Sequence, residues 1–188
     1  MGTPVLLSIF ALTFLFVVAI LLISSFLIGK IYMAPYLPTR TRDLERINRI
    51  ASLKPGDTFY DLGCGDGRVC RYIGAKNPKA KVVGVEIVHP LYLWNKLMGL
   101  IQPLRNVRMV RGNALKIDLS DADVVYLYAL TSSFNGAYKS KLLKDLKPGA
   151  RIISYVFSLN SWMGKMSKNC PRKGDMPIHI YEVDSGGC

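Results

Sequence analysis

The chain has 188 residues and a mass of 21.0 kDa, which is the size of one ordinary domain with a short additional segment. Half of its residues are apolar and a fifth are charged, so a disordered, a fibrous and a disulfide-scaffold protein are all excluded. Its four cysteines form no C-x-x-C pair, which favours free thiols in a reducing compartment. The formal net charge of +12 is compatible with binding to RNA or to anionic lipid headgroups.

The N-terminal segment, residues 1–29, contains no charged side chain, and only four Ser or Thr residues interrupt its apolar run over residues 5–28. As a helix this run extends about 36 Å, which is enough to cross a hydrocarbon core of about 30 Å. A cleaved signal peptide is the alternative, but such peptides begin with basic residues and have a shorter apolar stretch. We therefore predict an uncleaved transmembrane anchor over residues 1–29.

The charges that flank this anchor predict its orientation. No basic side chain precedes the apolar run, whereas six follow it between Lys30 and Lys54. Basic residues remain preferentially on the cytoplasmic side of a membrane. We therefore expect a single-pass membrane protein with its N-terminus outside and its catalytic domain on the cytoplasmic side, or in the equivalent compartment of an organelle.

The remainder of the chain alternates between strand and helix patterns. Residues 30–53 are predicted to form a basic, proline-interrupted linker and then a helix that Thr39 or Thr41 caps. Within a domain over residues 54–188, strands are expected at residues 58–62, 81–86, 107–110, 123–128, 151–157 and 178–183, and helices through residues 71–72 and at 91–100 and 134–146. This alternation predicts an α/β fold with a Rossmann-like, doubly wound and mostly parallel sheet.

A glycine-rich segment, Asp61-Leu62-Gly63-Cys64-Gly65-Asp66-Gly67-Arg68, follows the first strand, where a parallel sheet presents its ligand crevice. Its spacing is G-x-G-x-G and not the G-x-G-x-x-G of dinucleotide-binding folds. The carboxylate of Asp61, two positions before the first glycine, suits a cationic ligand better than a pyrophosphate. Glu86 ends the second strand, where it is placed to accept hydrogen bonds from ribose hydroxyls.

Together these residues resemble the class I, seven-β-strand S-adenosylmethionine-dependent methyltransferases. The resemblance implies that S-adenosylmethionine is the cofactor, that Asp61 and the loop hold its methionine moiety and that Glu86 holds its ribose. Asn113, after the third strand, then lies near the adenine, although many family members have Asp there. The expected cofactor-binding residues are therefore Asp61, Gly63, Cys64, Gly65, Asp66, Gly67, Glu86 and Asn113.

A narrower resemblance rests on short motifs outside this loop, namely Pro35-Tyr36-Leu37-Pro38-Thr39, Gly65-Asp66-Gly67-Arg68, Asp118, Phe157 and Trp162. They look like the membrane-anchored protein-lysine methyltransferases that modify the ATP synthase c subunit and the adenine nucleotide translocase. This implies lysine N-methylation of an integral membrane protein. The alternatives are methylation of a lipid or small lipophilic molecule, methylation of RNA, and a cofactor-binding module without activity. The absence of an N-P-P-Y motif after the fourth strand counts against RNA.

Three side chains are candidates for work on the methyl acceptor. Tyr128, after the fourth strand, is expected to orient a lysine amine, although a packing role for Tyr126 and Tyr128 is an equal alternative. Tyr36 is expected to form a lid over the cofactor. Asp118 either contacts substrate or caps a turn. The two histidines lack the spacing of a metal site, and no metal is expected.

Overall fold

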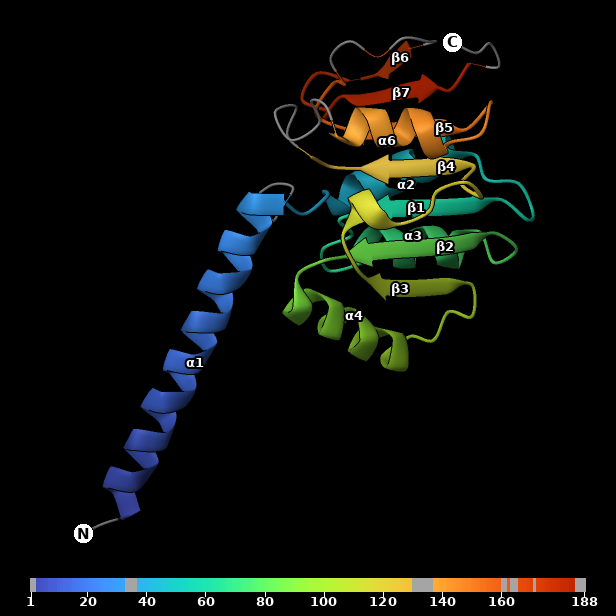
Figure 1. Ribbon diagram of the computed structural model, residues 1–188. Helices are drawn as coiled ribbons and strands as arrows, with labels where there is room; N and C mark the ends of the chain where they lie inside the picture. Colours follow the sequence, from blue (N-terminus) through green and yellow to red (C-terminus); the bar gives the residue numbers. More distant parts are fainter. Residues whose placement is uncertain are drawn as a thin grey trace.

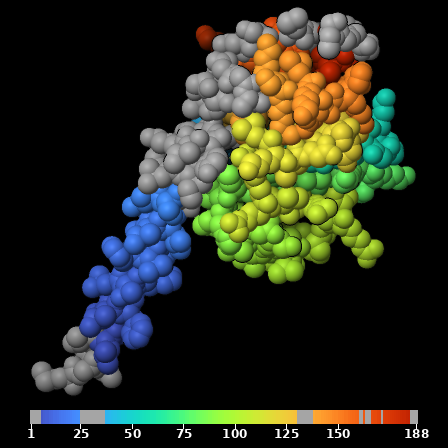
Figure 2. Space-filling view, viewed as in Figure 1, coloured from blue at the N-terminus to red at the C-terminus, as the bar shows by residue number. Residues whose placement is uncertain are grey.

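The computed structural model describes residues 3–32, 37–129, 137–159, 162, 166–170 and 172–184 (Figure 1). The first element is α1 (Thr3–Tyr32), which projects from the rest of the molecule as one long helix (Figure 2). Its segment Leu6–Ser24 has a mean hydropathy of 3.1, and none of that segment is buried. By length and composition α1 fits a membrane span or a signal sequence.

The remaining elements form a seven-stranded sheet with helices on both faces. They are η1 (Thr41–Asp43), α2 (Leu44–Ala51), β1 (Thr58–Leu62), α3 (Arg68–Lys76), β2 (Lys81–Glu86), α4 (His89–Ile101), β3 (Val107–Arg111), η2 (Ala114–Lys116), β4 (Val124–Leu127), α6 (Ala137–Asp145), β5 (Arg151–Tyr155), β6 (Met166–Asn169) and β7 (Ile178–Glu182). The strand order is β3-β2-β1-β4-β5-β7-β6. The strands β1 to β5 are parallel to one another, and β7 is antiparallel to both of its neighbours.

Two apolar layers hold the helices on the sheet. One layer lies under α6 and η2 and includes the fully buried Leu127 and Leu142. The other lies under α2 and α3 and includes Ile47 and Ile73, which are also fully buried. Because the central strands are covered on both faces, β1 and β4 are buried at every position. The predicted doubly wound, mostly parallel fold is therefore confirmed.

The predicted caps of the second helix are wrong. Neither Thr39 nor Thr41 caps it, because η1 precedes α2 and Asp43 occupies the N-cap position without a side-chain hydrogen bond. The Thr39 hydroxyl instead shares a buried 2.7 Å hydrogen bond with the Tyr126 hydroxyl. The segment before the domain is thus attached to the central strand β4.

Two further differences lie at the ends of the chain. α1 continues to Tyr32, beyond the predicted end of the anchor. The strand β6 was not predicted, because its Met-Ser-Lys-Asn sequence is polar and largely exposed. An edge strand needs only one neighbour, and β6 pairs antiparallel with β7 through backbone hydrogen bonds that its side chains do not reveal.

Candidate functional site

The glycine-rich loop joins β1 to α3 at the carboxyl ends of the parallel strands. Gly63, Gly65 and Gly67 have φ values of 82°, 57° and 73°, in the left-handed region that favours glycine. The backbone N–H groups of Gly63 and Cys64 both donate to the Val85 carbonyl, at 2.9 and 3.0 Å. The loop therefore curls against the end of β2.

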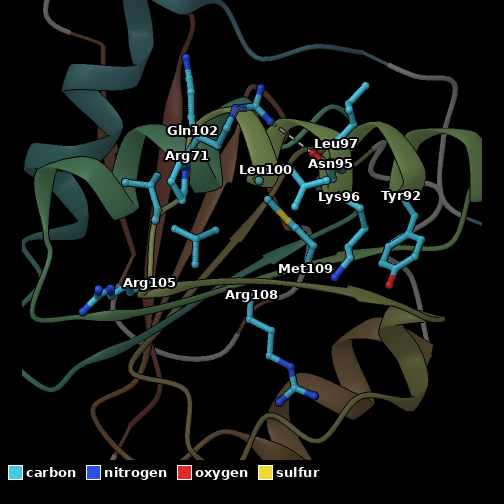
Figure 3. Close-up of a pocket in the computed structure, with 14 residues that line it drawn as sticks. Arg71, Tyr92, Asn95, Lys96, Leu97, Leu100, Gln102, Arg105, Arg108 and Met109 are labelled. Atoms are coloured by element: carbon cyan, nitrogen blue, oxygen red, sulfur yellow. Dashed lines mark hydrogen bonds between the residues drawn. The ribbon is translucent and has the colours of Figure 1, made fainter.

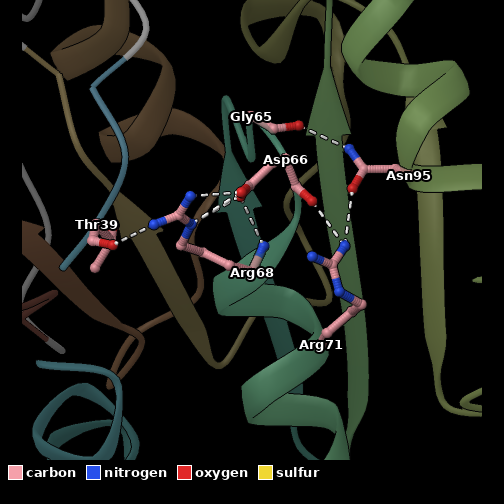
Figure 4. A network of polar contacts seen from close by, with 6 residues as sticks. All are labelled: Thr39, Gly65, Asp66, Arg68, Arg71 and Asn95. Carbon is pink, nitrogen blue, oxygen red and sulfur yellow. Dashed lines mark hydrogen bonds and ion pairs between the residues drawn. The ribbon is translucent and has the colours of Figure 1, made fainter. Parts of the chain in front are cut away.

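Two side chains that the sequence analysis missed fix this loop from outside. Asn95 of α4 is buried, and its Nδ2 donates to the Gly65 carbonyl at 2.7 Å. Arg71 of α3 donates to the Asp66 carbonyl at 2.7 Å (Figure 4). Asn95 packs closely against the loop, since a Cβ added to Gly67 would lie 2.1 Å from Asn95 Oδ1. An asparagine in the middle of a largely apolar helix was the signal available in the sequence.

The carboxylate of Asp66 is held by Arg68. Arg68 Nη2 lies 2.7 Å from Asp66 Oδ2, and the same guanidinium donates to the Thr39 carbonyl at 3.2 Å (Figure 4). Although burial opposes ionisation, these hydrogen bonds hold the pKa of Asp66 below its usual value. A contact between Asp66 and the cofactor stays a prediction, whereas its contact with Arg68 joins the loop to the segment after α1.

Asp61 is a buried carboxyl at the end of β1. Its hydrogen-bond partner within the described part of the chain is the Cys70 thiol, which donates at 3.4 Å. Burial raises the pKa of Asp61 from 3.8 to about 7, and the nearby Glu86 and Asp66 add to this rise. The negative charge of an ionised Asp61 is therefore poorly compensated by its neighbours. A cationic ligand beside Asp61 would be stabilised by the charge of this carboxylate.

Glu86 ends β2 and faces the same loop. Its two carboxylate oxygens accept hydrogen bonds from the backbone N–H groups of Gly65 and Val88, each at 2.7 Å. Burial nevertheless raises the pKa of Glu86. Each carboxylate oxygen can accept a second hydrogen bond, so Glu86 can hold the loop and still accept from a hydroxyl.

Asn113 lies between the end of β3 and the start of η2. Its Oδ1 accepts from the Leu115 N–H at 2.9 Å and caps η2. A small cavity of about 20 Å³ lies here, lined by Gly63, Val85, Ile87, Gly112, Asn113, Ala114 and Tyr138. The structure thus brings Asn113 together with Gly63 of the loop and Val85 of β2, whereas its contact with the adenine stays a prediction.

Tyr128 follows β4 and belongs to an aromatic cluster. Its ring makes an edge contact with Tyr155, at 4.9 Å between centroids, and stacks on Phe157 at 6.0 Å. Tyr128 is partly exposed and burial raises its pKa, whereas Tyr126 is buried in the sheet. The packing interpretation therefore holds for Tyr126, and Tyr128 remains available to a ligand.

The other two acceptor-side candidates are Asp118 and Tyr36. Asp118 is exposed on the connection before β4, and its Oδ1 accepts from the Ser120 N–H at 2.9 Å. This bond favours turn capping over contact with substrate. Tyr36 lies outside the described residues. Among the described residues, no group of three or more His, Cys, Asp or Glu side chains is placed to hold a metal.

Comparison with known proteins identifies the family. Residues 61–166, from the buried aspartate through the fifth strand to the start of β6, match the ANTKMT methyltransferase domain. The chain belongs to this family. A protein-lysine N-methyltransferase of Saccharolobus islandicus is 35% identical over 140 residues, which cover 70% of this chain and 81% of that protein.

More distant relatives act on other substrates. A 24-methylenesterol C-methyltransferase of Arabidopsis thaliana is 30% identical over 148 residues, covering 66% of this chain and 37% of that protein. The crystal structure of an RNA methyltransferase from Salinibacter ruber, in complex with S-adenosyl-L-homocysteine, has a TM-score of 0.73 and 25% identity. The match covers 81% of this chain and 97% of that one. The family member described here is thus an S-adenosylmethionine-dependent methyltransferase.

The residues at the end of the sheet fit this cofactor. A buried carboxyl with a raised pKa suits its cationic sulfonium and amino groups, and Glu86 retains acceptor capacity for ribose hydroxyls. The glycine turn lets a ligand approach the backbone closely, because no Cβ is present there.

Proposed function

We propose that this methyltransferase is anchored in a membrane by α1 and methylates lysine side chains of a membrane-associated protein. The observation that carries the proposal is the connection between the apolar helix and the site. α1 ends at Tyr32, and Thr39 is bonded to both Tyr126 and Arg68 beside the glycine loop. Five peptide steps join Tyr32 to Leu37, and they span at most about 18 Å. An anchor at α1 therefore keeps the crevice near the bilayer surface.

The choice of lysine rests on the archaeal relative and on the aromatic cluster. S-adenosylmethionine, when bound, supplies an activated methyl group on a sulfonium. The amine that accepts it must be neutral, although the pKa of a lysine in water is about 10.4. Tyr128, which packs on the buried Tyr155, and Phe157 offer a partly desolvated aromatic wall. Loss of hydration beside this wall disfavours the charged ammonium, and the rings orient the amine.

The chain's other residues set up this transfer. Asp61 in its carboxylate form provides the countercharge for the cofactor's cationic groups, and Glu86 holds the ribose while it keeps Gly65 in place. Alignment of the three reacting atoms and exclusion of water then lower the barrier, and the proton of the amine passes to solvent.

Intact-mass analysis of membrane proteins from wild-type and deletion cells tests this proposal. We expect one membrane protein to lose a mass of one to three methyl groups in the deletion strain and to regain it with the intact gene. The Glu86→Ala variant serves as the control with weakened cofactor binding, and it should restore the mass only in part. Lipids and RNA from the same cells are analysed in parallel. A methyl group missing from a lipid or an RNA, with every protein unchanged, would overturn the lysine assignment.

A second comparison tests the anchor. Removal of residues 1–29 is expected to leave activity on a detergent-solubilised substrate nearly unchanged, while methylation in cells collapses. Confinement to the membrane raises the effective concentration only for substrates in the same membrane. Replacement of residues 1–29 by an unrelated membrane span of the same orientation is the matched control and should restore methylation. Full methylation in cells by the truncated enzyme would contradict the role of the anchor.

A further inference from the structure

The helix α4 carries its large apolar side chains on the outside of the protein. Helices that cover a sheet normally turn their apolar stripe inward. In α4 the buried residue is the polar Asn95. The side chains at successive i, i+3 and i+4 positions on the opposite side are between 46% and 81% exposed, and we call them the α4 apolar face: Leu93, Trp94, Leu97, Leu100 and Ile101.

The position of α4 relates this face to the anchor. α4 contacts α1, the helix that is proposed to span the membrane. In Figure 1, α4 is the lowest helix of the domain, on the side toward the N-terminus of α1, and it runs away from α1 across the direction of that helix. If α1 crosses a bilayer, α4 therefore runs along its surface with its outer side toward the lipid.

A basic groove adjoins the apolar face. It has a volume of about 720 Å³ and lies between α4 and β3, with Lys96, Arg105 and Arg108 around it (Figure 3). These three side chains are exposed, and within the described residues none of them has a hydrogen-bond or ion-pair partner in the structure. No acidic residue lines the groove, so an anion is favoured there.

We propose that α4 is a membrane-binding helix, whose apolar face enters the boundary between headgroups and acyl chains while Lys96, Arg105 and Arg108 contact anionic headgroups. This inference rests on the proposed anchoring by α1. Adjacent apolar and basic surfaces are the combination that interfacial helices use. A nucleic acid is the weaker candidate for this surface, because its phosphates would match the three cations but leave five large apolar side chains without a partner.

Membrane contact at α4 has a consequence for the active site. Asn95, on the inner side of the same helix, holds the Gly65 carbonyl of the cofactor loop. One helix thus faces the bilayer on one side and the cofactor loop on the other. Contact with lipid would hold the crevice at a defined height and angle above the membrane, whereas α1 and a short linker alone would leave the domain free to rotate.

Tryptophan quenching in the full-length protein tests the depth of α4. Trp162 packs on Tyr181 inside the domain, at 5.8 Å between ring centroids, so the Trp162→Phe variant leaves Trp94 as the reporter. We expect this variant, reconstituted in vesicles, to lose roughly half of its emission when the acyl chains carry bromine, because interfacial helices insert about 5–10 Å. Unchanged, water-like emission in a protein that resists alkaline extraction would overturn the inference. Loss of the protein on extraction would instead refute the anchor.

Substitutions separate the apolar and basic contributions. Leu97→Gln combined with Leu100→Gln should remove most of the quenching. Leu143→Gln, at a leucine of α6 that is exposed about as much as Leu97, is the control and should not. In vesicles with anionic lipid, quenching should exceed that in neutral vesicles, and replacing Lys96, Arg105 and Arg108 by glutamine should abolish this difference. Shielding of Trp94 from aqueous iodide by an RNA oligonucleotide or by a protein, but not by vesicles, would assign the face to that other partner and overturn the proposal.

Discussion

Replacement of the buried carboxyl by an amide, Asp61→Asn, should stabilise the protein without cofactor and weaken cofactor binding. Burial raises the pKa of Asp61 from 3.8 to about 7. Three pKa units correspond to about 4 kcal/mol of destabilisation once the carboxyl is ionised. The amide avoids this cost, although a buried NH₂ group without a hydrogen-bond acceptor lowers the free energy of unfolding by about 1–3 kcal/mol. The net gain expected above pH 7 is about 1–3 kcal/mol.

The pH dependence distinguishes this effect from ordinary packing changes. Because the folded pKa exceeds the unfolded one, the folded wild-type protein binds the extra proton between about pH 4 and pH 7. The stability of the wild type therefore falls as the pH rises through this window. From pH 5 to pH 7 the free energy of unfolding of the variant should rise relative to that of the wild type by about 2–3 kcal/mol. Above pH 7 this difference should level off. The amide cost is the same at each pH and cancels.

Thermal unfolding of the full-length protein in mild detergent measures this difference. For a chain of this size, about 2–3 kcal/mol corresponds to a relative shift in Tm of roughly 5–10 °C. Calorimetry at pH 8 should show S-adenosylmethionine binding weakened about 10- to 100-fold, the range for loss of a hydrogen bond to a charged group. Asp118→Asn is the control, because hydrogen bonds to Ser120 hold the pKa of this exposed carboxyl below its usual value and it does not titrate in the window. Parallel Tm profiles for Asp61→Asn and wild type, or equal cofactor affinities, would refute the reasoning.

Three further substitutions address the loop and the acceptor side. Glu86→Gln should weaken cofactor binding by roughly 10-fold and Glu86→Ala by roughly 10- to 100-fold, as measured by calorimetry, because glutamine keeps one acceptor oxygen; equal losses would contradict this. Gly67→Ala should lower the free energy of unfolding by about 2–4 kcal/mol in denaturant titrations, since its Cβ meets Asn95 and its φ is positive; a neutral result would mean that the loop readily shifts. Tyr128→Phe should lower methyl transfer with an unchanged cofactor Kd, measured by single-turnover assays and calorimetry, and full activity would remove Tyr128 from the site.

The fold could be predicted because its strong patterns are local. The buried strands β1 and β2 were predicted at their observed bounds, since both are short apolar runs ended by turns or charged residues. The segment from Asp61 to Arg68 marked the crevice for the same reason, because tight turns between a strand and a helix require glycine. The polar strand β6 could not be predicted, since its pairing with β7 leaves no periodic signal in its own residues.

Patterns along the chain were enough to predict the fold class, the glycine-rich loop with Asp61 and Glu86, and the apolar character of residues 5–28, because each depends on neighbouring residues. The three-dimensional structure was needed to show that Asn95 and Arg71 hold the loop and that Thr39 bonds Tyr126 instead of capping a helix. It alone also showed that the apolar side of α4 faces outward. Contacts between residues tens of positions apart depend on how helices are placed on the sheet, and burial is a property of that placement. A pattern along the chain can show that a helix is apolar, but only packing shows which of its sides is left exposed.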